Sequence, residues 1–106
     1  MKAYYRDGKK YVPYNLAWDN MPIDLSFLYS EEKPAGKHGF LKVDGDHFAF
    51  EDGTEARFFG VNFNSGANFP THKHSEMVAE RLAQTGINLV RFHQMDAEWS
   101  LPNLFQ

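Results

Sequence analysis

The feature that most constrains the fold is the order of patterns along residues 55–99. An apolar run, a loop rich in Gly and Asn, an amphipathic helical pattern, a single Gly and a second apolar run follow one another. This order predicts a strand, a loop, a helix and a second strand, which is the repeating unit of proteins with a parallel sheet. The whole chain has 106 residues, so we expect one domain at most, built around this single unit.

The helix of this unit is predicted over residues 71–85. Thr71 follows a Pro and has the side chain of a helix N-cap, whereas Gly86 can take the left-handed conformation that ends a helix. If the C-cap directly precedes this Gly, the Schellman motif brings Leu82 and Ile87 into contact. The local sequence therefore predicts both ends of the helix.

The two strands of the unit are predicted on either side of this helix, over residues 56–63 and 87–93. Gly60 lies inside the first run and indicates a bend or a close approach between backbones. The second run is mostly apolar, as expected of a strand buried on both faces. Its polar members, Asn88 and Arg91, would then need specific partners.

Upstream of this unit, two Asp-Gly dipeptides that lie eight residues apart predict a three-stranded antiparallel meander over residues 40–63. Asp44-Gly45 and Asp52-Gly53 suit type I′ turns, in which both central residues have positive φ. The apolar face of the meander would consist of Leu41, Val43, Phe48 and Phe50.

The chain is accordingly divided into residues 1–39, an N-terminal hairpin and irregular arm, and residues 40–106, the meander and the strand–helix–strand unit. Asp7-Gly8 between aromatic residues predicts the N-terminal hairpin. Asp24 and Ser26 are alternative candidate caps for a single helical turn in the arm. The predicted fold class is α+β, with one unit of the α/β kind.

The composition excludes several classes of function. A net charge of −3, a pI near 5.9 and the lack of a basic stripe argue against binding to nucleic acid. No apolar run approaches the roughly 20 residues of a membrane span. The chain has no Cys, so it has no disulfides and no thiolate chemistry. Polar residues follow Met1, so no signal peptide is visible, and we expect a cytoplasmic location if Met1 is the native start.

Three motifs in this order resemble the opening of a glycoside hydrolase from the retaining clan that includes the cellulase-like family 5. They are GTEARFFGVNF, then NFP before a helix, then RLAQTGINLVRFH, and the upstream PAGKHGFL is similar to the lead-in of bacterial members. The resemblance covers roughly residues 24–106. The matching residues are Gly60, Val61 and Asn62 at the end of the first strand and Asn88, Val90 and Arg91 in the second.

The resemblance implies a (β/α)₈ barrel of about 250 residues, of which this chain would supply the hairpin below the barrel and the first βαβ unit. Such enzymes cleave β-linked polysaccharides or oligosaccharides by a double displacement that needs two carboxylates about 5 Å apart and no cofactor. In the family these carboxylates follow strands 4 and 7, which this sequence does not contain. We therefore expect the isolated 106-residue chain to be inactive.

The resemblance also implies roles for individual residues. Arg91 would hydrogen-bond the nucleophile carboxylate and hold it ionised; its alternative is a plain structural ion pair. Trp99 matches no family position, but its ring is able to stack on a sugar. The residues that would line the substrate cleft at the carboxyl ends of the strands are Asn62, Asn64, His93 and Gln94.

Several polar groups have a simpler interpretation. The loop with Asn68 is either part of a ligand site or a run of favoured turn residues. His72 and His74 resemble a zinc-binding pair, but two residues apart on a helix they face different directions, so no metal site is expected. Asp96 and Glu98 have the spacing of an ordinary polar loop, and no partner for acid–base catalysis accompanies them.

A hypothesis from another class is a small carbohydrate-binding or protein-interaction module without catalysis, which would use exposed aromatic residues of the meander. The two hypotheses differ in how the chain behaves in solution. An incomplete barrel leaves unpaired strand edges and an uncovered sheet face, so it should self-associate or need the rest of the barrel. A finished module should be a cooperatively folded monomer.

Overall fold

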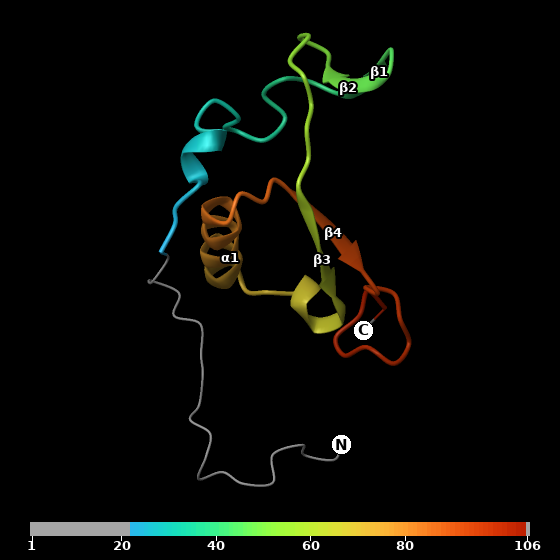
Figure 1. Ribbon diagram of the computed structural model, residues 1–106. Coiled ribbons are helices and arrows are strands. Elements are labelled where there is room, and N and C mark those ends of the chain that lie inside the picture. Colours follow the sequence, from blue (N-terminus) through green and yellow to red (C-terminus); the bar gives the residue numbers. More distant parts are fainter. Residues whose placement is uncertain (1–21, 106) are drawn as a thin grey trace, which may run out of the picture.

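The computed structural model describes residues 22–105 (Figure 1). Strands β1 and β2 form an antiparallel hairpin, and β3 and β4 form a parallel pair connected through helix α1. The fold is thus α+β, as predicted, and residues 22–105 contain no barrel. The hairpin predicted around Asp7-Gly8 lies outside the described residues. The elements are η1 (Ser26–Tyr29), β1 (Leu41–Asp44), β2 (His47–Phe50), β3 (Gly60–Asn64), η2 (Ser65–Asn68), α1 (His72–Gln84) and β4 (Leu89–His93).

Both predicted ends of α1 are confirmed. The Thr71 side chain accepts a hydrogen bond from the backbone N–H three residues later, as an N-cap does. Gly86 has φ +82° and donates its N–H to the Ala83 carbonyl at 3.0 Å. Ile87 donates to the Leu82 carbonyl at 2.9 Å. These two bonds define the Schellman motif.

The parallel pair is joined in a register that sets Gly60 opposite Leu89 and Asn64 opposite His93. A Cβ atom on Gly60 would lie 3.1 Å from the Leu89 carbonyl oxygen and 3.2 Å from its Cβ. The close backbone approach predicted at Gly60 is therefore confirmed, and β3 begins at this residue.

The prediction of a three-stranded meander is wrong. The third run meets β2 only at its start, in an isolated bridge between Ala49 and Glu55. Beyond it, the Asn88 side chain donates to the Arg57 carbonyl and accepts from the Phe59 N–H, both at 2.8 Å, and the Asn88 N–H bonds the Phe59 carbonyl. Because Asn88 bonds these backbone groups, residues 57–59 do not pair with β2, and the strand that follows them, β3, pairs with β4.

The hairpin turns also differ from the predicted type. Asp44 pairs with His47, so Gly45 is the first central residue of the turn, and of the two central residues only Gly45 has positive φ. This arrangement fits a type II′ turn. Gly53, with φ +87°, ends a three-residue loop that its N–H closes onto the Phe50 carbonyl. The predicted apolar face is confirmed by the register, which places together Leu41, Val43, Phe48 and Phe50.

Little of the described chain is buried. The buried apolar residues are Ala49 and Ala56, and no large side chain is fully buried among residues 22–105. The expectation of a second strand buried on both faces is wrong, because Leu89 is 48% and Phe92 59% exposed. Residues 22–105 provide no third strand for the β3–β4 pair and no layer over its second face (Figure 1).

The arm before the hairpin is attached to α1 through η1, which lies next to the carboxyl end of that helix (Figure 1). The Leu25 N–H donates to the Gln84 carbonyl at 2.9 Å, and the Tyr29 hydroxyl donates to the Gly86 carbonyl. Asp24 accepts from a backbone N–H at the start of η1, so the predicted helical turn is confirmed as a 3₁₀ turn.

Replacing Gly60 by Ala is expected to loosen the β3–β4 pair. The added Cβ forces the backbone of Leu89 away, and we expect a loss of ~1–3 kcal/mol in local stability, as for other overpacked sites. Faster amide hydrogen exchange along β3 and β4 would measure it. Gly66→Ala is the matched control, since its Cβ would meet no atom closer than 3.6 Å. Equal acceleration in both variants would contradict the prediction.

Candidate functional site

The polar residues predicted to line a cleft lie together at the carboxyl ends of β3 and β4. Asn62 is the register partner of Arg91, and Asn64 is the register partner of His93. Partners in a parallel pair share a face, so these four side chains form one polar row on one side of the sheet. Asn62, Asn64 and Arg91 are exposed and His93 is half-buried. We call this polar row, together with the residues that directly follow β3 and β4, the carboxyl edge.

Each strand is followed at this edge by a residue in the left-handed region. Ser65 has φ +49° and Gln94 has φ +60°. Non-glycine residues rarely adopt this conformation, and such positions concentrate at ligand sites, where surrounding contacts hold them in place. The predicted site residue Gln94 therefore lies beside His93 at the carboxyl edge, in a backbone conformation that a glutamine rarely adopts.

Asn68 has a structural part in this edge. Its side chain is buried and donates from Nδ2 to the Ser65 carbonyl at 3.0 Å and to the His93 carbonyl at 2.8 Å. These bonds join η2 to the end of β4. Of the two interpretations of this loop, Asn68 takes the structural one, whereas Asn64 remains exposed and available to a ligand.

The backbone of Arg91 belongs to the β3–β4 ladder, but its side chain makes no hydrogen bond or ion pair within residues 22–105. It is exposed on the polar row and does not lie between buried apolar side chains. The internal ion pair considered for it is thus not made within this range, and its five N–H donors face solvent.

The segment after β4 forms a closed loop that carries Trp99. The Leu104 N–H donates to the Met95 carbonyl at 2.9 Å, and the buried side chains of Ser100 and Asn103 bond backbone carbonyls within the loop. Trp99 is 67% exposed, so its ring is free to contact a ligand. Among residues 22–105, no three His, Asp or Glu side chains are placed to hold a metal ion.

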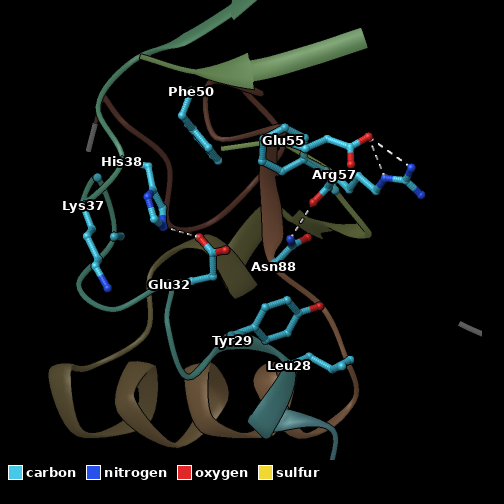
Figure 2. A pocket seen from close by; sticks show the side chains of 12 residues that line it. Leu28, Tyr29, Glu32, Lys37, His38, Phe50, Glu55, Arg57 and Asn88 are labelled. Atoms are coloured by element: carbon cyan, nitrogen blue, oxygen red, sulfur yellow. Dashed lines mark hydrogen bonds and ion pairs between the residues drawn. The ribbon is translucent and has the colours of Figure 1, made fainter. Parts of the chain in front are cut away.

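A second cluster, absent from the sequence prediction, surrounds His38. Its Nδ1 lies 2.5 Å from Asp52 Oδ2. On the other side of the ring, its Nε2 faces Glu32, whose Oε2 lies 3.2 Å away (Figure 2). The imidazole is only 15% exposed and stacks on Phe50 with ring centroids 5.7 Å apart. His38 therefore links Glu32 of the arm to Asp52 in the loop that follows β2.

This cluster forms one wall of a cleft of about 390 Å³, which we call the His38 cleft (Figure 2). Further lining residues come from the segments directly before β3 and β4, so the cleft lies at the amino end of the parallel pair, away from the carboxyl edge. Its lining residues are Leu28, Tyr29, Glu32, Ala35, Gly36, Lys37, His38, Phe50, Glu55, Arg57, Phe58 and Asn88.

Comparisons with protein-family models, with curated proteins and with solved structures find no match to this chain. Inference about function therefore depends on its own residues. No helix in the described part of the chain is long and apolar enough to cross a bilayer.

We expect the loss of hairpin stability at low pH to be caused partly by protonation of Asp52. Hydrogen bonds from the Thr54 backbone, then from its side chain and from His38, lower the pKa of the Asp52 carboxyl from 3.8 to about 2. A lowered pKa means that the ionised group stabilises the fold above the unfolded value, and that this contribution is lost as the pH falls from 3.8 through about 2.

Carboxyl ¹³C NMR would measure this pKa directly, and Asp52→Asn should remove the corresponding part of the acid-induced loss of stability. Asp46→Asn is the control, because Asp46 is a fully exposed carboxylate in the turn between β1 and β2. A midpoint for Asp52 at its unfolded value of 3.8 would contradict the assignment.

Proposed function

We propose that this chain is the first βαβ step of a glycoside hydrolase barrel resembling family 5, which acts on β-linked polysaccharide or oligosaccharide by retaining double displacement. In this proposal the carboxyl edge is part of the substrate cleft. Asn62, Asn64, His93 and Gln94 contact sugar hydroxyls there, and Trp99 stacks on a ring.

The observation that carries the proposal is the position of Arg91. It lies beside Asn62 in the middle of the exposed face of a parallel pair, two residues before the Asn64–His93 pair at the end where α/β enzymes bind ligands. Within residues 22–105 no carboxylate reaches it, and an arginine in a barrel strand needs one when further strands close over it. The nucleophile of the proposed enzyme, supplied from another strand, is that partner, and the guanidinium holds it ionised.

The hairpin has a consistent place in this proposal. It lies beyond the amino ends of β3 and β4, on the side away from the carboxyl edge (Figure 1). In a barrel this is the bottom, where the resemblance places a covering hairpin. Its apolar face, with Val43 72% and Phe48 49% exposed, would then pack against further strands and helices.

The coding sequence beyond the codon for Gln106 tests this proposal. A barrel of about 250 residues has about 30 residues for each βα unit, so strand 4 should end about 60 residues after β4 and strand 7 about 150 residues after it. We expect a Glu directly after each of these strands, the first preceded by Asn. An open frame without such residues would refute the proposal.

The isolated chain, which has neither carboxylate, is expected not to hydrolyse an aryl β-glycoside. Release of the aryl group above that of a blank without protein would contradict this expectation.

A second candidate function is a non-catalytic interaction module, and the exposed apolar face of the hairpin favours it. In such a module, that face would contact a partner protein or a carbohydrate directly and would not pack against the bottom of a barrel.

Sedimentation of the purified chain separates the two functions. For the barrel unit we expect association that grows with concentration, together with strong binding of a dye that detects apolar surface, because β3 and β4 have uncovered edges and the apolar face of the hairpin is exposed. A monodisperse monomer with a sharp thermal transition would instead favour the module. Phe48→Ser, on the exposed hairpin face, should reduce association, whereas His47→Ser, its neighbour on the other face, should not.

A further inference from the structure

The His38 cleft has no part in the proposed function, since it lies at the opposite end of the parallel pair from the carboxyl edge. We propose that it is a separate binding site for a small neutral sugar, one or two pyranose rings in size. Its volume of about 390 Å³ is at the small end of the range of about 300–1,000 Å³ that is usual for ligand pockets. This inference does not rest on the proposed function.

The aromatic wall of the cleft provides a surface for an apolar ring face. Phe58 is 43% exposed, and its ring packs edge-to-face against Phe50 with centroids 6.3 Å apart. Leu28 and Tyr29 lie on the facing side, where η1 closes the cleft (Figure 2). The two walls therefore accept a flat, partly apolar molecule between them.

The charged side chains of Glu32, Arg57 and Lys37 each have a polar neighbour within the chain. Glu32 lies 3.2 Å from His38, and Arg57 lies 3.0 Å from Glu55. Lys37 donates to a backbone carbonyl of the arm at 2.8 Å. An ionic ligand would compete with one of these existing contacts, whereas a neutral ligand leaves all of them in place. The cleft therefore favours a neutral ligand.

The rim still offers hydrogen bonds of both kinds. The carboxylates of Glu32 and Glu55 are acceptors with lone pairs to spare, and Arg57 and Lys37 retain N–H donors. A purely apolar ligand would remove water from these groups without replacing its hydrogen bonds. A hydroxyl both donates and accepts, so a ring that carries several hydroxyls and one apolar face satisfies both the rim and the aromatic wall.

Saturation-transfer NMR on the full 106-residue chain tests the proposal, because it detects the ligand whatever the size of the protein assembly. The probes are methyl β-glucoside and cellobiose, for which we expect binding with a millimolar Kd, as the small number of ligand atoms allows. Glucuronate and glucosamine, matched in ring but charged, should bind several-fold more weakly. Equal binding of the charged rings, or no transfer to the neutral ones at tens of millimolar, would overturn the proposal.

Two variants place the binding in the cleft. Phe58→Ala should raise the Kd about tenfold, because the ring surface that contacts the sugar is lost. Its control is Phe92→Ala, because Phe92 is also half-exposed and also packs edge-to-face, with Phe63 at 6.4 Å, but lies outside the cleft. Ala35→Leu fills the cleft from an exposed position without removing a contact, so it guards against misfolding of the first variant. Binding unchanged in both cleft variants, or lost equally in Phe92→Ala, would refute the site.

Discussion

The parallel pairing of β3 with β4 is the constraint on which the rest of the described structure depends. Parallel strands normally occur in sheets that are covered on both faces. Here the pair has α1 as its crossover helix and no third strand within residues 22–105. Part of its apolar surface stays in contact with water, at Leu89 and Phe92. The pair is therefore held by its backbone ladder and by polar side chains rather than by a core.

Asn88 shows how polar side chains take over that part. Its amide and backbone bond both Arg57 and Phe59, so one residue determines where the chain leaves the hairpin and where β3 starts. Asn68 does the same at the other end of the pair, where it ties η2 to His93. Each of these amides joins segments more than twenty residues apart, and the register of the two strands follows from them.

The two candidate sites lie at opposite ends of this pair and differ in chemistry. The carboxyl edge is open and polar, with Arg91 exposed beside Asn62. The His38 cleft is a bounded space whose charges are paired and whose walls are partly aromatic. The first was predictable because strand ends and polar patterns are visible in the sequence. The second was not, since His38 and Asp52 are fourteen residues apart and share no motif.

The sequence by itself determined the features that depend on a few neighbouring residues: the ends of α1 at Thr71 and Gly86, and the hairpin face of β1 and β2. Caps, left-handed glycines and strand alternation act within about one helical turn or one strand pair, so local patterns are sufficient for them. Only the tertiary structure decided that Asn88 ends the meander and that His38 meets two carboxylates. Those outcomes depend on which distant segments come within hydrogen-bonding reach, and no local preference specifies that.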